Sequence, residues 1–276
     1  MYIISLTMND KFIDVERIIA DKKPGLAKSL PRFVVRYFKR ILHQREINDI
    51  IRENHNLKNE AFCKDIVQRF ELKLKTEGLE NIPKEGGVIL ACNHPLGGMD
   101  AMALVDVVSS HRKDITFIVN DVLMNLANLN DLFVGVNKLG SNVKESLLKV
   151  NEAFASDRAV FVFPSGLVSR KQKGVVRDKP WKKTFVSQSK RNQKAVIPVH
   201  IQGELSPFFY RLANLRRFLG IRVNIEMLYL VNELFRQRNR EIRITFGKPI
   251  PHTFFTSEKS DSEWAKHVED LVYKLG

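Results

Sequence analysis

A histidine and an aspartate lie six positions apart in segment 91–100, which reads Ala-Cys-Asn-His-Pro-Leu-Gly-Gly-Met-Asp. The segment follows an apolar run, so it predicts a tight turn from a strand into a helix, with Asp100 at or near the N-cap. Across such a turn the Asp100 carboxylate can bind one ring nitrogen of His94 and leave the other as a general base. Gly97 and Gly98 allow backbone N–H groups to approach a substrate oxygen. The motif alone is weak, because a single histidine in a turn is more often structural.

Three further segments follow in chain order: 134–141 (Val-Gly-Val-Asn-Lys-Leu-Gly-Ser), 162–170 (Val-Phe-Pro-Ser-Gly-Leu-Val-Ser-Arg) and 195–199 (Ala-Val-Ile-Pro-Val). Together with the first segment, this order resembles the four-block signature of the glycerolipid, or lysophospholipid, acyltransferase superfamily. Residues 244–250, Ile-Thr-Phe-Gly-Lys-Pro-Ile, resemble that family's closing strand. The resemblance covers roughly residues 80 to 251 and does not extend to the N-terminal helices.

Two features depart from the usual pattern of that family. Five residues separate His94 from Asp100, where the family usually has four, and Ser165 stands where the third block usually has Glu. Both features resemble a hemolysin-like branch that includes O-acyltransferases of bacterial amino-acid lipids. They argue against carrying over glycerol-3-phosphate specificity, because the family links the Glu and Arg of the third block to the acyl acceptor.

The resemblance implies an O-acyltransferase that moves a fatty acyl group from a thioester to the hydroxyl of a lyso-lipid. His94 would take the hydroxyl proton and Asp100 would orient His94. Pro164 and Gly166 would shape the third block, and Arg170 would hold an anionic head group or a carrier phosphate through its fork of donors. The implied substrate-binding residues are Asn93, Gly97, Gly98, Asn137, Lys138, Pro164, Ser165, Gly166 and Arg170.

Several alternatives stay open. The preferred acceptor is a monoacylated amino-acid lipid, and the runner-up reaction is that of a 1-acylglycerol-3-phosphate acyltransferase. Asn137 and Lys138 fit the acceptor site, but an ordinary loop with Ser141 or Asn142 as N-cap fits equally well. A nucleophilic Ser165 is disfavoured, because the first Gly of a G-x-S-x-G elbow is missing. More distant alternatives are a lipid hydrolase, a nucleic-acid-binding protein and a non-catalytic membrane-binding protein.

An alternation of strands and helices must position these residues. The pattern predicts an α/β fold with a mostly parallel sheet flanked by helices over 81–276, and a basic helical region, a possible membrane-contacting cap, over 1–80. The expected strands are 88–92, 115–119, 132–136, 159–163, 195–201 and 241–246, and a helix is expected over 144–154. Ser260 and Glu263 form a capping-box pattern for a last helix.

Composition narrows the partners. The 276 residues are 44% hydrophobic, and 45 Lys and Arg against 31 Asp and Glu give a net charge of +14. Such a chain folds, and its charge favours an anionic partner: acyl carrier protein, coenzyme A or the inner leaflet of a membrane. We do not expect nucleic acid, because no standard binding signature is present. Ten cations and the single acid Asp178 lie between residues 170 and 194, which predicts a basic surface or a merely solvated loop.

The remaining signals concern the cellular location. Two cysteines without CxxC spacing and scattered histidines give no sign of a disulfide framework or a metal site, so we expect no cofactor beyond the thioester co-substrate. Residues 1–10 lack the features of a signal peptide, and no apolar run is long enough to span a bilayer. We therefore expect a cytoplasmic enzyme, peripheral on the inner membrane. Residues 33–42 and 207–219 mix aromatic and cationic residues, as an interfacial helix or a core-packed helix does.

Overall fold

The computed structural model describes residues 11–22, 25, 29–120, 126–136, 143–172 and 174–276. Its main sheet is built from β1 (Lys73–Glu77), β2 (Val88–Cys92), β3 (Ile115–Asn120), β4 (Phe133–Val136), β5 (Ala159–Val162), β8 (Val196–Ile201) and β9 (Glu241–Phe246). The strand order is β1-β9-β8-β2-β5-β3-β4, and every pairing is parallel except that of β8 with β9. The predicted α/β fold with a mostly parallel sheet is confirmed.

A separate hairpin pairs β6 (Arg170–Gln172) with β7 (Val175–Arg177). The helices are α1 (Val15–Lys22), α3 (Arg32–Ile41), α4 (Gln44–Glu53), α5 (Asn59–Arg69), α6 (Gly98–Val108), α7 (Val143–Ala155), α8 (Thr184–Asn192), α9 (Pro207–Phe218), α10 (Leu230–Phe235) and α11 (Asp261–Tyr273). Short 3-10 turns are η1 (Leu79–Asn81), η3 (Ala127–Leu129), η4 (Ile225–Tyr229) and η5 (His252–Phe254). None of these described helices is long and apolar enough to cross a bilayer.

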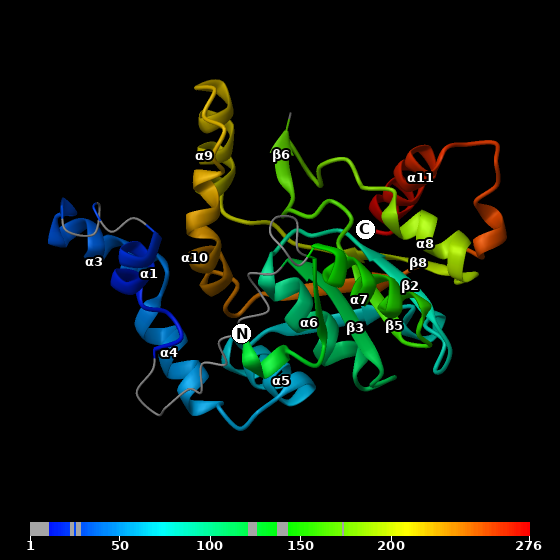
Figure 1. Ribbon diagram of the computed structural model, residues 1–276, viewed down its shortest axis with the longest axis horizontal. Helices are drawn as coiled ribbons and strands as arrows, with labels where there is room; N and C mark the ends of the chain where they lie inside the picture. Colours follow the sequence, from blue (N-terminus) through cyan, green and yellow to red (C-terminus); the bar gives the residue numbers. More distant parts are fainter. Residues whose placement is uncertain (1–10, 23–24, 26–28, 121–125, 137–142, 173) are drawn as a thin grey trace.

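The sheet is covered on both faces (Figure 1). Helices α5, α6, α9 and α10 contribute to one apolar cluster, and α7, α8 and α11 contribute to the other. Strand β2 feeds both clusters by alternation: Leu90 belongs to the first, while Ile89 and Ala91 belong to the second. Because both faces are buried, the strands read as continuous apolar runs, which is why β2 was predictable from sequence.

The N-terminal region differs from its prediction in one element. We expected residues 1–80 to be helical, but 73–77 form the edge strand β1, paired in parallel with β9 from Lys73↔Glu241 to Glu77↔Thr245. Leu74 packs against the core while the other four residues of β1 are exposed, and β1 lies at the end of the strand order, so it is an edge strand. Since the buried residues of α5 belong to the same core, the sandwich begins before residue 80.

The last helix follows its sequence signal. Ser260 Oγ accepts a hydrogen bond from the Glu263 N–H at 3.3 Å, and Glu263 Oε2 accepts one from the Ser260 N–H at 2.8 Å. The predicted capping box is therefore present at the start of α11. Strands β2, β5 and β8 run parallel, so the loops at their carboxyl ends meet at one edge of the sheet, where open α/β sheets usually carry their sites.

Candidate active site

The turn between β2 and α6 carries His94 and Asp100. Strand β2 is buried along its whole length, and α6 begins one residue after Gly97. Gly97 has φ +70°, and a Cβ at this position would lie 3.0 Å from Leu230, so both backbone conformation and space favour glycine. The chain can therefore reverse within a few residues and bring the first turn of α6 back to the end of β2.

The imidazole of His94 binds the Asp100 carboxylate, with Nδ1 2.8 Å from Oδ2. The His94 side chain is 19% exposed and that of Asp100 is 0% exposed. Burial raises the pKa of Asp100, and hydrogen bonds to Oδ2 from His94 and from the Leu96 N–H, the latter at 2.9 Å, oppose this rise. The His94 ring stacks on Phe163 at a centroid distance of 4.2 Å.

This geometry matches the expected imidazole–carboxylate pair. When Nδ1 carries the hydrogen that Asp100 accepts, Nε2 has a free lone pair. Within the part of the chain that the structure describes, Nε2 has no hydrogen-bond partner. The site can therefore accept a proton at Nε2 of a partly exposed imidazole, whose orientation is fixed at Nδ1 by Asp100 and on one ring face by Phe163.

A second carboxylate, Asp178, holds the main chain of His94. Asp178 Oδ1 accepts hydrogen bonds from Ser169 Oγ at 2.6 Å and from the His94 N–H at 3.3 Å, and Oδ2 accepts one from the Trp181 indole at 2.9 Å. The Ser169 N–H donates to the His94 carbonyl at 2.8 Å. Burial raises the pKa of Asp178 as well, against the stabilising effect of these donors. The backbone on both sides of His94 is thus fixed by segment 163–181.

Sequence reasoning did not identify Asp178, Ser169, Phe163 or Trp181 as parts of this site. The only signal in the sequence was that Asp178 is the single acid among the ten cations of 170–194. An acid among cations is ordinarily expected at the surface, so this signal did not predict that Asp178 is buried. Its partners come from the loop after β5 and from the loop before α8, which no local pattern connects.

Two residues predicted to bind substrate use their polar groups on the protein itself. The Asn93 side chain donates to the Ile201 carbonyl at 2.9 Å and accepts from the Ile201 N–H at 2.6 Å. It thereby links the ends of β2 and β8 in the manner of a strand pairing. The Ser165 hydroxyl donates to the Leu167 carbonyl at 2.7 Å and is buried. Both side chains therefore stabilise the main chain at the carboxyl edge of the sheet through hydrogen bonds.

The prediction that Arg170 faces an anionic substrate group is corrected by its position. Arg170 is buried at the start of β6, where its guanidinium forms an ion pair with Glu226 at 2.9 Å and donates to the Val168 carbonyl at 2.7 Å. Arg216 binds the same carboxylate at 2.9 Å. A guanidinium enclosed by its own chain in this way joins α9 and η4 to β6 and is not open to a substrate.

Of the other predicted site residues, some lie in the described part of the chain and some do not. Pro164 and Gly166 form the turn after β5: the Gly166 N–H donates to the Phe163 carbonyl at 2.9 Å, and Gly166 has φ +66°. Gly98 is the first residue of α6, four positions after His94. Asn137 and Lys138, as well as the alternative caps at 141 and 142, lie outside the described residues.

Only some of the ten cations of segment 170–194, which was predicted to be a basic surface, are exposed. Arg170 and Lys194 are buried, and Lys194 donates to the Ser156 carbonyl. Arg177 binds Glu269 at 2.8 Å and also pairs with Asp270. Among the described residues of 170–194, the cations classed as exposed flank α8 or lie near its end, namely Lys182, Lys183, Lys190 and Arg191. Several of the ten charges are therefore matched or enclosed within the fold.

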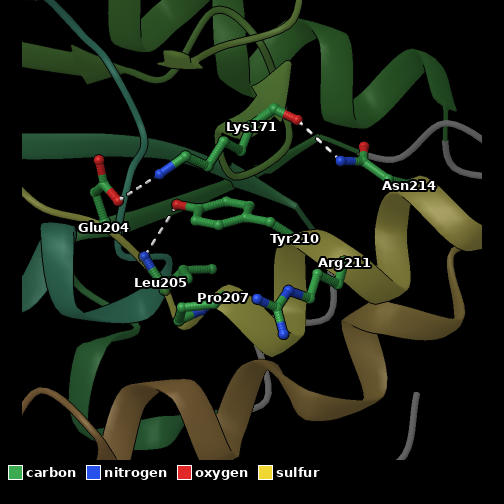
Figure 2. A pocket seen from close by; sticks show the side chains of 7 residues that line it. All are labelled: Lys171, Glu204, Leu205, Pro207, Tyr210, Arg211 and Asn214. Atoms are coloured by element: carbon green, nitrogen blue, oxygen red, sulfur yellow. Dashed lines mark hydrogen bonds and ion pairs between the residues drawn. The ribbon is translucent and has the colours of Figure 1, made fainter. Parts of the chain in front are cut away.

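A cavity of about 260 Å³ opens between β6 and α9 (Figure 2). Lys171 and Arg211 lie on its wall, with Lys171 Nζ 3.4 Å from Glu204 Oε2. Tyr210 accepts a hydrogen bond from the Leu205 N–H at 3.0 Å, which fixes the chain after β8. Because β8 and β2 run parallel, this cavity lies at the same edge of the sheet as His94.

The family model described as Acyltransferase matches residues 17–275. The chain belongs to the acyltransferase family. The predicted membership of the glycerolipid acyltransferase superfamily, and the prediction that the protein is an enzyme of this class, are confirmed.

Two lyso-glycine lipid O-acyltransferases are similar to this acyltransferase over 264 residues. The protein of Bacteroides thetaiotaomicron is 44% identical, and the alignment covers 95% of this chain and 97% of that one. The protein of Phocaeicola vulgatus is 41% identical, with 95% of each chain covered. Among solved structures, the 1-acyl-sn-glycerophosphate acyltransferase PlsC of Thermotoga maritima is similar with a TM-score of 0.48 and 18% identity, covering 95% of this acyltransferase and 93% of that chain.

Proposed function

We propose that this acyltransferase moves a fatty acyl group from a thioester to the hydroxyl of a lyso-lipid, and that the acceptor is a monoacylated amino-acid lipid of the lyso-glycine type. The identities of 44% and 41% over nearly whole chains to two lyso-glycine lipid O-acyltransferases support this acceptor. The departures of the His94–Asp100 spacing and of Ser165 from the usual family pattern point in the same direction.

The observation that carries the mechanism is the contact of 2.8 Å between His94 Nδ1 and buried Asp100. His94 Nε2 takes the proton of the acceptor hydroxyl while the oxygen forms a bond to the thioester carbonyl carbon. When the tetrahedral intermediate collapses, the carbon–sulfur bond breaks, and the leaving thiolate receives the proton from the imidazolium. Asp100 stabilises the imidazolium between these two transfers. No covalent acyl-enzyme is needed.

The start of α6 is the proposed site for the developing oxyanion. The first N–H groups of a helix have no partner within that helix, and the helix dipole adds positive potential there. Gly97 and Gly98 have no side chains that would keep a thioester carbonyl away from these groups. The turn at Pro164 and Gly166 forms the proposed opposite wall, and Asn137 and Lys138 remain proposed acceptor contacts.

The donor and the location complete the proposal. We expect acyl carrier protein or coenzyme A to carry the acyl group, in keeping with the net charge of +14, because both are anionic. The acceptor keeps one acyl chain and resides in a bilayer, so the enzyme works as a cytoplasmic protein that is peripheral on the inner membrane. Helices α1, α3 and α4 are the proposed membrane-contacting cap, and Phe33 on α3 is exposed.

Acyl transfer from long-chain acyl carrier protein and from acyl-coenzyme A to a panel of lyso-lipids tests the proposal. The panel contains monoacylated glycine, serine and ornithine lipids and lysophosphatidic acid. We expect transfer to the glycine lipid that collapses in His94→Ala and Asp100→Asn and persists in His55→Ala, which changes an exposed histidine. Preference for lysophosphatidic acid would overturn the acceptor, and activity indifferent to His94 would overturn the mechanism.

A further inference from the structure

The end of α9 and the turn after it form an exposed apolar tip. Every residue of 217–223, which reads Arg-Phe-Leu-Gly-Ile-Arg-Val and is called the α9 tip below, is exposed. The Phe218 side chain is 87% exposed and that of Val223 is 71% exposed. Large apolar side chains gathered in this way on a surface mark a contact with another apolar phase.

The α9 tip is held in one shape by its own hydrogen bonds. The Gly220 N–H donates to the Arg217 carbonyl at 3.1 Å, and the Ile221 N–H donates to the Arg216 carbonyl at 3.0 Å. Gly220 has φ +68°, which is typical of the residue that ends a helix. Arg216 donates back to the Ile221 carbonyl at 3.0 Å from its buried position. The apolar side chains thus extend from an ordered turn, so binding to a partner costs little backbone conformational entropy.

The charges of the α9 tip select the kind of contact. No acidic residue occurs between Pro207 and Ile225, whereas Arg211, Arg217 and Arg222 are all exposed. Exposed apolar side chains flanked by unopposed arginines are complementary to a bilayer that carries anionic head groups over an acyl interior.

The α9 tip is joined to the turn that carries His94 through a buried ion cluster. Arg216, next to the tip, binds Glu226, which binds Arg170, and Arg170 follows Ser169, whose N–H donates to the His94 carbonyl. The hairpin β6–β7 runs beside α9, where Asn214 donates to the Lys171 carbonyl at 3.3 Å (Figure 2). Its Val175 is exposed, and the hairpin and the α9 end project on the same side of the molecule (Figure 1).

We propose that the α9 tip, together with Val175 of the hairpin, docks on an anionic bilayer surface and inserts its apolar side chains at the boundary between head groups and acyl chains. The arginines bind the head-group charges, and the buried ion cluster fixes the orientation of the His94 site over the bilayer. The role of this docking in acceptor delivery rests on the proposed function, whereas the docking itself requires only the bilayer.

Co-sedimentation with vesicles tests the docking without any acyl transfer. We expect wild type to bind vesicles of phosphatidylglycerol and phosphatidylcholine better than vesicles of phosphatidylcholine alone. The double variant Phe218→Ser, Val223→Ser should bind at least about 10-fold more weakly, because each change removes a large apolar side chain from the inserted surface. Arg217→Gln, Arg222→Gln should lose the preference for phosphatidylglycerol by about 10-fold. Leu147→Ser, Leu148→Ser on α7 is the matched control, since those side chains are 51% and 61% exposed.

A second measurement separates docking from catalysis. Activity of the Phe218→Ser, Val223→Ser variant should fall with a lyso-lipid embedded in vesicles and stay at the wild-type level with a short-chain acceptor dispersed in water. Unchanged vesicle binding by that variant, an equal loss in the α7 control, or loss of protein self-association in place of vesicle binding would each overturn the docking. Vesicle binding that depends on the α9 tip in an enzyme that transfers no acyl group would support the docking and overturn the proposed function.

Discussion

Two chain segments meet at His94, and each brings one buried carboxylate to it. The turn 93–100 supplies Asp100, which binds the imidazole ring, while segment 163–181 supplies Asp178, which binds the backbone N–H. Asp100 acts on the group that would exchange a proton, and Asp178 acts on the chain that carries this group.

The two carboxylates also differ in how fully their oxygens are bonded. Both oxygens of Asp178 accept hydrogen bonds, from Ser169, His94 and Trp181. Asp100 uses only Oδ2, for His94 and Leu96, and within the described residues its buried Oδ1 has no partner. A fully bonded buried carboxylate stabilises the fold, whereas one that keeps an unpaired oxygen is retained at a cost that the fold alone does not explain. We therefore expect Asp178 to matter chiefly for stability and Asp100 chiefly for catalysis.

Replacing the residue that both carboxylates hold should give the largest effect. We expect His94→Ala to lower kcat by about 10²-fold to 10⁴-fold, because the general base is lost. Since the side chain is partly exposed and its main-chain bonds do not depend on the ring, the melting temperature should change little. Steady-state kinetics and a thermal melt of the same preparation check both expectations. Wild-type kcat in His94→Ala, or a loss of activity that only reflects unfolding, would contradict the assignment of His94 as the general base.

Asp100→Asn should approach the effect of His94→Ala. The amide keeps the shape but cannot stabilise the imidazolium, so we expect kcat to fall by about 10²-fold or more with the fold retained. The pKa of Asp100 is raised by burial, so the neutral amide costs the folded state no charge burial. If Asp100→Asn instead lowered the melting temperature strongly and spared kcat, the assignment of the two carboxylates would be reversed.

Asp178→Asn should show the opposite balance. The amide nitrogen cannot accept a hydrogen bond from either Trp181 or Ser169, so one buried donor loses its partner and the free energy of unfolding falls by about 2 kcal/mol. We expect kcat to fall by only about 10-fold, through the looser backbone at His94. Denaturant unfolding measures the first effect.

Alkylation of Cys92 gives an independent measure of that loosening. Cys92 is enclosed at the end of β2, and burial raises the pKa of its thiol, so the native protein should resist iodoacetamide. Asp178→Asn should increase labelling of Cys92, read by peptide mass spectrometry, more than Asp100→Asn does. Equal labelling of Cys92 in the two variants would contradict the assignment of Asp178 to stability and Asp100 to catalysis.

Ser165→Ala should have the smallest effect. The hydroxyl only donates to the Leu167 carbonyl in the turn after β5, so we expect kcat to stay within about 3-fold of wild type. A loss as large as that of His94→Ala, accompanied by a covalent acyl-enzyme in mass spectrometry, would revive the nucleophilic serine that the missing elbow glycine disfavours.

The same contrast explains what the sequence could predict. The contact between His94 and Asp100 was predictable because both residues lie in one short turn whose glycines and flanking elements can be read locally, whereas their assignment to catalysis depended on the resemblance to the acyltransferase superfamily. The role of Asp178 was not predictable, because the His94 N–H that it binds lies 84 residues away and meets it only through the crossovers of the sheet. The prediction that Arg170 faces substrate was wrong for a related reason. Its partner Glu226 lies 56 residues away on a 3-10 turn, and an arginine in a basic segment gives no sign that it is buried.

The sheet shows the same limit. The buried strands β2, β5 and β8 are short apolar runs, and such runs are strong signals. Strand β1 reads Lys-Leu-Lys-Thr-Glu and has only one apolar residue facing the core, so its identity depends on its pairing with β9. Its pairing partners, from Glu241 to Thr245, follow it in the chain by more than 160 positions.

The pairing of β1 with β9 also bears on how the chain folds. It joins residues 73–77 to 241–245, so β1 cannot complete its ladder until nearly the whole chain has been synthesised. Contacts of such long sequence separation slow folding, since the intervening chain must be ordered before they form. During synthesis the first strand therefore waits as a free edge, and its lysines, Lys73 and Lys75, give that edge the charge that discourages pairing with other nascent chains.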